Sequence, residues 1–282
     1  MTYRTLLLHL DDDRAAEVRN GQAVDLALRI DAHVNGLSCH RPTAMGAEFA
    51  AALGGPIDPL TRELQFARQQ AIEREQRFRS LCERRAVPSF ETAIDDTEEA
   101  GRAILRRAPL HDLVVLGQPD PLDPDASGRR DFVADVVQHS PRPTLLFPYA
   151  GSFKDVGRTT LVAWDGSHGA ARAVSDALPL LKQSRDVVVV QFDREAGLSG
   201  PIDQSPLHGV IRWLGRHQVE ASGSVRFTDG DIGNALLSHA ADVGADLLVM
   251  GCWGHSRWAE RLLGGATRTV MESMTVPVLT SH

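Results

Sequence analysis

Short apolar runs alternate with amphipathic segments along the second part of the chain. The runs are rich in β-branched residues, which is typical of strands buried on both faces. They lie at residues 160–163, 186–192, 219–228, 246–250 and 276–280. Apolar residues recur at helical spacing over 167–182, which begins at the N-cap residue Ser167, and over 232–243, while 207–217 is a weaker helical candidate. The alternation predicts an α/β fold with five parallel strands, helices on both faces, and ligands at the carboxyl ends of the strands.

The first part of the chain repeats this pattern. Its predicted strands lie at residues 3–10, 33–38, 89–94, 113–116 and 144–147. Residues 59–85 carry apolar positions at helical spacing among alternating charges. This favours an amphipathic helix that covers the sheet over one that binds a partner or a membrane surface.

An internal repeat relates the two parts. The similar segments, at offsets of 134 and 154 residues, are 111–118 with 245–252 and 5–11 with 159–165. The repeat predicts two domains, 1–150 and 151–282, and therefore two tandem open sheets of five parallel strands.

The composition limits which partners the protein can have and in which compartment it is expected. The net charge of −7, without a basic stripe, argues against nucleic acid as a partner. The three cysteines have no spacing that indicates a zinc site or a disulfide framework, which favours a reducing compartment. No apolar stretch reaches the length of a signal peptide or a membrane span. We therefore expect a soluble cytoplasmic protein without a membrane partner.

A glycine-rich segment follows the strand at 246–250. Its glycines are spaced Gly251-x2-Gly254-x9-Gly264, and a helix is predicted to begin at Gly265. Glycine lets the backbone approach a ligand closely, and the free N–H groups of a helix N-terminus favour a phosphate. The segment therefore predicts a phosphate site.

Taken together with the repeat, four motifs identify a family resemblance. They are Ala163-Trp-Asp-Gly-Ser, Asp246-Leu-Leu-Val-Met-Gly-Cys-Trp-Gly-His-Ser, Leu262-Leu-Gly-Gly-Ala-Thr-Arg and Val276-Pro-Val-Leu. The chain resembles the universal stress protein (UspA-like) family in its tandem, two-domain form. The resemblance implies a Rossmann-like, adenine nucleotide alpha hydrolase-like fold, in agreement with the alternation of strands and helices.

The resemblance also implies a nucleotide site in the second domain. In nucleotide-binding members, an acidic residue at the end of the first strand lies near adenine and ribose, and the glycine loop wraps ribose and phosphates. The residues at the matching positions are Ala163, Asp165, Phe192, Met250, Gly251, Gly254, His255, Gly264, Gly265, Ala266 and Thr267. Strand alternation places Ala163 and Asp165 on one side and Trp164 on the other, where it is expected to pack elsewhere. His255 either donates a hydrogen bond to phosphate or fixes the loop.

The chain departs from the family pattern at Gly265. The family's ATP-binding pattern has Ser or Thr there, and a charge-assisted hydrogen bond is worth about 1.5–3 kcal/mol. Thr267 is a candidate to replace that hydroxyl, or it bonds the helix backbone instead.

The first domain is degenerate at the same place. It lacks the second glycine after Gly117 and has Asp120, Asp123 and Asp125 where phosphates would lie. These aspartates are interpreted as solvated turn residues and not as a calcium loop, so no nucleotide is expected in this domain.

Motifs for catalysis or metal binding are not evident. The segment Asp165-Gly-Ser-His168 is interpreted as a strand end followed by a helix cap. Cys252 is interpreted as a small residue that packs under the glycine loop. We expect neither catalytic residues nor a metal site, and any ATP hydrolysis is expected to be slow.

These observations predict a stress-response protein that binds ATP or ADP, with Mg²⁺, in its C-terminal domain as a regulatory module. The alternative is a tandem scaffold without nucleotide that acts through an unidentified protein partner. The resemblance further implies that strands 144–147 and 276–280 pair within the chain as a pseudo-dimer, because the last strands of single-domain members pair across a dimer interface; a homodimer of the whole chain is an open alternative.

Overall fold

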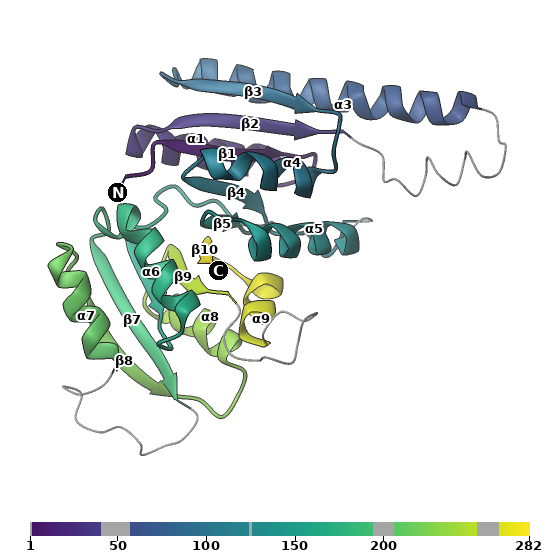
Figure 1. Ribbon diagram of the computed structural model, residues 1–282. Coiled ribbons are helices and arrows are strands. Elements are labelled where there is room, and N and C mark those ends of the chain that lie inside the picture. Colours follow the sequence, from purple (N-terminus) through teal and green to yellow (C-terminus); the bar gives the residue numbers. More distant parts are fainter. Residues whose placement is uncertain (1, 41–56, 124–125, 194–205, 253–264) are drawn as a thin grey trace.

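The computed structural model describes residues 2–40, 57–123, 126–193, 206–252 and 265–282. The halves 1–150 and 151–282 contribute five strands each to one ten-stranded sheet of order β3-β2-β1-β4-β5-β10-β9-β6-β7-β8 (Figure 1). The predicted fold class is confirmed. The division into two domains at residue 150 stays a prediction.

The described residues of the first half form five strands and four α-helices. The strands are β1 (Thr5–Leu10), β2 (His33–Cys39), β3 (Phe90–Asp95), β4 (Leu113–Gly117) and β5 (Thr144–Phe147). The helices are α1 (Ala16–Ile30), α3 (Ile57–Arg84), α4 (Ala100–Arg107), which continues as a 3-10 turn (Ala108–Leu110), and α5 (Ala126–His139). The long α3 agrees with the helix predicted at 59–85. It packs closely on the sheet, since a Cβ on Gly36 in β2 would lie 2.6 Å from the Phe78 ring.

The second half repeats the arrangement. Its strands are β6 (Thr159–Ala163), β7 (Asp186–Asp193), β8 (Ser222–Phe227), β9 (Leu247–Gly251) and β10 (Val278–Ser281). Its helices are α6 (His168–Leu181), α7 (Pro206–Arg216), α8 (Ile232–Asp242) and α9 (Gly265–Ser273). The predicted cap is confirmed, because the Ser167 hydroxyl accepts a hydrogen bond of 3.1 Å from the Ala170 N–H.

Buried side chains form one core on each face of the sheet. Leu6 and Leu8 of β1 pack on the face covered by α1, α3, α6 and α7. Leu7 packs on the other face, covered by α4, α5, α8 and α9. Successive strand residues alternate between the faces, and helices cover both, which explains the continuous apolar runs in the sequence.

The halves join through an antiparallel pair of strands. Strand β10 pairs with β5, with Leu279 opposite Leu145 and Thr280 opposite Thr144. All other strand pairs between described residues are parallel. The predicted pairing within the chain is therefore confirmed.

The sheet register preserves the internal repeat. Leu6 pairs with Leu113 in the first half, and Thr160 pairs with Leu247 in the second. These pairs keep the offsets of 154 and 134 residues found in the sequence. Residues at those offsets therefore occupy equivalent places in the two halves.

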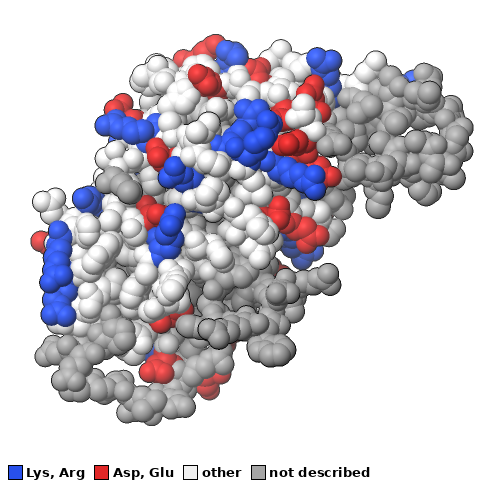
Figure 2. Space-filling view, in the orientation of Figure 1, with Lys and Arg blue, Asp and Glu red and all other residues white. Residues whose placement is uncertain are grey.

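Charged side chains of both signs are interspersed on the face shown in Figure 2, most of them on the first half. Arg79 and Glu75 of α3, 2.6 Å apart, form one such surface pair. Along the described residues, no helix is both long and apolar enough to cross a membrane.

Candidate functional site

A cavity of about 220 Å³ lies in the second half, where the ends of β6 and β9 meet the first turns of α6 and α9. Eight of the predicted site residues line it: Ala163, Asp165, Phe192, Met250, Gly251, Gly265, Ala266 and Thr267. The other three predicted residues, Gly254, His255 and Gly264, lie outside the described residues. The structure thus brings together all the predicted residues that it describes.

The cavity has further lining residues that the sequence did not single out. They are Trp164, Ser167, Ala170, Val190, Ile232 and Leu236. Val190 is the register partner of Ala163 across β6 and β7, and Ile232 and Leu236 belong to the apolar stripe of α8. These apolar residues looked like core positions, and the sequence signal for them was the helical and strand periodicity alone.

The position of the Trp164 side chain agrees only partly with the prediction. It packs against the core on the opposite face from Ala163, as strand alternation requires. It also lines the cavity, so the expectation that it packs only elsewhere was wrong. The physical reason is that β6 ends at Ala163, and regular alternation ends with it.

Asp165 presents an exposed carboxylate at the edge of the cavity. Its Oδ1 accepts a hydrogen bond of 2.9 Å from the Ser167 N–H, which fixes the turn between β6 and α6. The other carboxylate oxygen has no hydrogen bond to the described residues. The side chain is therefore held in place while one oxygen can accept a hydrogen bond from a ligand hydroxyl.

Gly251 is required by the packing of the chain on itself. A Cβ there would overlap the backbone of Gly169 and Ala170, lying 2.8 Å from the Gly169 carbonyl oxygen. A Cβ on Gly169 would in turn lie 2.9 Å from the Cys252 carbonyl oxygen. The sequence attributed this glycine to close approach of a ligand, whereas the structure shows close approach of the first turn of α6.

The N-terminus of α9 opens onto the cavity. Gly265 is its first residue, and among the described residues no atom lies within 4 Å of where its Cβ would be. The first turn carries no acidic residue, and the helix dipole favours an anion there. Thr267 is buried in this turn, with 6% of its surface exposed.

Two contacts hold α9 in place. Gly233 of α8 lets the helices meet, because a Cβ on it would lie 2.6 Å from the Thr269 Cβ. The Gln118 amide nitrogen of the first half donates a 3.0 Å hydrogen bond to the Met271 carbonyl oxygen. The anion-facing end of α9 therefore projects from a helix that is fixed from both halves.

Cys252 is buried at the end of β9, while the glycine loop under which it was predicted to pack lies outside the described residues. Its thiol is buried and donates to the Ser281 carbonyl oxygen at 3.0 Å. Burial raises the pKa of this thiol to about 11, so it is protonated and unreactive at neutral pH. Within the described ranges, no cluster of three or more His, Cys, Asp or Glu side chains could hold a metal ion.

A larger groove, about 770 Å³, lies between α1 and α3 of the first half. Some of its charged side chains pair with one another: the Asp12 carboxylate accepts from Arg74, and from Arg77 at 2.5 Å. The first turn of α1 borders the groove, but the carboxylates of Asp11, Asp13 and Glu17 line it as well. The groove therefore offers less to an anion than the cavity of the second half.

The acidic residues after β4 differ from the prediction of solvated turn residues. Asp120 is buried, with 5% of its surface exposed, and pairs with Arg14 at 2.5 Å. Asp123 pairs with Arg129 at 3.1 Å, and Asp125 lies outside the described residues. The prediction was wrong for Asp120 because its arginine partner is distant in the sequence.

Comparison with known proteins gives the family. Residues 157–282 match the family model described as the universal stress protein family. Universal stress protein YxiE from Bacillus subtilis strain 168 is 27% identical over 144 residues, which cover 42% of this chain and 95% of YxiE.

Solved structures show a similar fold over the whole chain. A universal stress protein from Archaeoglobus fulgidus DSM 4304 has a TM-score of 0.71 at 17% identity and covers 99% of this chain and 98% of its own. A protein of unknown function from Pseudomonas aeruginosa PAO1 has a TM-score of 0.62 at 14% identity, with 98% of this chain and 92% of its own covered. Residues 157–282 are therefore a universal stress protein domain, and the solved structures show that the fold extends over the whole chain.

Proposed function

We propose that the second half binds an adenine nucleotide, ATP or ADP, in the cavity at the ends of β6 and β9. The observation that carries this proposal is that one cavity is lined by Asp165, Gly265 and six other residues that the family resemblance implied. These residues are spread over a hundred positions of the sequence.

The lining suits the parts of a nucleotide. Ala163, Val190, Phe192, Ile232 and Leu236 form an apolar wall that a flat base can contact. The Asp165 carboxylate lies at the edge of this wall and can accept a hydrogen bond from a ribose hydroxyl. The N–H groups of the first turn of α9 supply donors for phosphate oxygens.

The cavity is smaller than the roughly 300–1,000 Å³ of typical ligand pockets, at about 220 Å³. We propose that residues Gly254, His255 and Gly264 complete it around the phosphates. Mg²⁺ usually binds through substrate phosphates and one or two carboxylates. With the free Asp165 oxygen at the ribose, the phosphates themselves would hold Mg²⁺.

We propose that the nucleotide acts as a regulatory ligand in a stress response. The Ser167 hydroxyl is engaged as the cap of α6 and is not free as a nucleophile, and the described residues that line the cavity include no histidine or lysine to act as a base. Any hydrolysis would then be slow. The cytoplasmic location and the protein partner stay predictions.

Calorimetric titration with Mg-ATP, ADP and adenosine tests the proposal, together with mass spectrometry of ligand released from the purified protein. We expect ATP or ADP to bind, and Asp165→Ala to weaken binding at least tenfold. Asp186→Ala is the matched control, because Asp186 is exposed at the opposite end of the sheet. A protein that releases no nucleotide and gives no heat with millimolar Mg-ATP would overturn the proposal and favour the scaffold that acts through protein contacts.

A further inference from the structure

The two halves share one frame but differ at two positions beside the candidate site. His9 of β1 is equivalent to Ala163 of β6, because the β1–β4 and β6–β9 pairs have the same register. Phe132 of α5 is equivalent to Ala266 of α9, because the helices and the strands that follow them keep the offset of 134 residues. Each ring of the first half thus replaces an alanine of the second.

The alanines border a cavity, whereas the rings contact each other. Ala163 and Ala266 both line the cavity of the second half. In the first half, the His9 and Phe132 ring centroids lie 5.0 Å apart with an interplanar angle of 53°. His9 is buried, with 9% of its surface exposed. By the equivalence of the halves, this ring pair takes the place that the cavity has in the second half.

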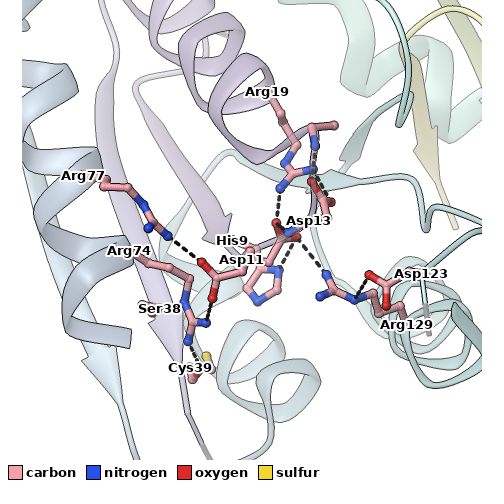
Figure 3. A network of polar contacts seen from close by, with 12 residues as sticks. His9, Asp11, Asp13, Arg19, Ser38, Cys39, Arg74, Arg77, Asp123 and Arg129 are labelled. Atoms are coloured by element: carbon pink, nitrogen blue, oxygen red, sulfur yellow. Dashed lines mark hydrogen bonds and ion pairs between the residues drawn. The ribbon is translucent and has the colours of Figure 1, made fainter. Parts of the chain in front are cut away.

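The acidic residue at the strand end is also engaged in the first half. Asp11 is equivalent to Asp165, but it pairs with Arg19, whose side chain is 1% exposed (Figure 3). Arg129 of α5 lies 3.8 Å from the same carboxylate, and Asp13 holds Arg19 at 2.8 Å. A ligand hydroxyl would have to break buried ion pairs to reach Asp11, whereas Asp165 is exposed.

Repulsion between the aspartates after β4 and a nucleotide's phosphates explains the difference between the halves less well than side-chain size does. Asp120, which follows β4, is neutralised by Arg14, and Asp123 is neutralised by Arg129. The acidic residues of this region therefore present less negative charge than the sequence alone indicates. Two differences between the halves remain: the size of the side chains at the two equivalent positions, and the ion pairs that already occupy the Asp11 carboxylate.

We propose that side-chain size at positions 163 and 266 decides which half takes the ligand. Two alanines admit a nucleotide to the second half, while the His9–Phe132 pair and the Arg19 ion pairs stand in its place in the first. The chain then binds one nucleotide. This inference rests on the proposed function.

Stoichiometry of the full chain separates the two claims. Calorimetry with Mg-ATP should give one site per chain. Two sites per chain would overturn this inference alone, whereas no binding would overturn the proposed function and this inference with it. In a histidine-labelled protein, the NMR signal of His9, assigned through His9→Gln, should stay unchanged when ATP is added. A shift of this signal at the same ATP concentrations in wild type and in Asp165→Ala, which weakens the second site, would also overturn the inference.

Transplanting the ring pair tests the role of size directly. Ala163→His with Ala266→Phe should lower ATP affinity at least 100-fold, and the first half shows that this frame accommodates both rings. Asp186→Ala is the control, since Asp186 is exposed at the opposite end of the sheet, and it should keep wild-type affinity. If circular dichroism shows that the double variant Ala163→His/Ala266→Phe is folded, and it binds ATP like the wild type, the inference is overturned. If the ring-bearing variant fails to fold, stoichiometry and the His9 signal decide.

Discussion

Restoring a hydroxyl at position 265 should strengthen nucleotide binding. Gly265 is the first residue of α9, it borders the cavity, and a Cβ there meets no atom of the described residues within 4 Å. Its φ lies outside the left-handed region that only glycine tolerates well. Gly265→Ser therefore places a hydroxyl at the anion-facing end of the helix without steric strain.

The size of the gain follows from the bond that the serine adds. A hydrogen bond between a hydroxyl and a charged phosphate is worth about 1.5–3 kcal/mol, which corresponds to roughly a 10- to 150-fold lower Kd. Position 265 is exposed, so water competes and the serine loses rotamer freedom on binding. We therefore expect a gain near the lower end, about tenfold.

The assay compares ATP and adenosine on three proteins by calorimetry: wild type, Gly265→Ser and Gly265→Ala. The alanine variant adds the Cβ and stiffens the backbone without a hydroxyl, so it isolates the hydrogen bond. ATP affinity should rise with serine and not with alanine, and adenosine affinity should not change. Equal ATP affinity of the serine and alanine variants would refute the placement of phosphate at the start of α9.

Three further predictions concern stability and are read from urea unfolding. Gly251→Ala should cost about 1–3 kcal/mol, because its Cβ overlaps the backbone at Ala170. Arg19→Leu should cost about 3–5 kcal/mol, because it leaves buried carboxylates without their partner. Burial lowers the pKa of His9 to about 4, while the unfolded imidazole has a pKa of about 6.5. The unfolded state thus binds the extra proton between these values, so stability should fall by about 3 kcal/mol as the pH drops from 6.5 to 4, and His9→Phe should remove that part of the pH dependence.

Matched controls separate these effects from general damage. Gly265→Ala places a methyl group in open space and should not destabilise the fold. Arg268→Leu removes an exposed pair with Glu272 and should cost less than about 1 kcal/mol. Equal losses for Arg19→Leu and Arg268→Leu, or an unchanged pH profile in His9→Phe, would contradict the burial assigned to these groups.

The strands and the repeat could be predicted because burial leaves a direct record in the sequence. Strands covered on both faces are apolar at every position, as in Leu113–Gly117 and Leu247–Gly251. The β5–β10 junction was expected from the family resemblance and not from the periodicity of the sequence. Element ends were less accurate: the strand predicted at 219–228 begins at Ser222, because the preceding residues belong to the turn after α7.

Partners that come from distant elements could not be predicted. Arg19 lies in an ordinary amphipathic segment, and nothing in its neighbourhood indicates that its guanidinium is buried between Asp11 and Asp13. The same holds for Arg14 and Asp120, which are far apart along the chain. The role of Gly251 was also hidden, because the α6 backbone that it contacts comes from another part of the sequence.

The asymmetry of the halves has a consequence for how the candidate site is held. The first half needs no ligand to complete its packing, since the His9–Phe132 rings and the Arg19 ion pairs already engage the groups at its strand ends. It reaches the second half through β5 and through Gln118, which accepts from the Tyr149 N–H at 3.2 Å and donates to the Met271 carbonyl oxygen. A ligand at the N-terminus of α9 therefore meets a helix whose opposite end is already fixed by a ligand-independent neighbour. Because the helix is held before binding, less ordering has to be supplied by the ligand, and a small site can retain affinity.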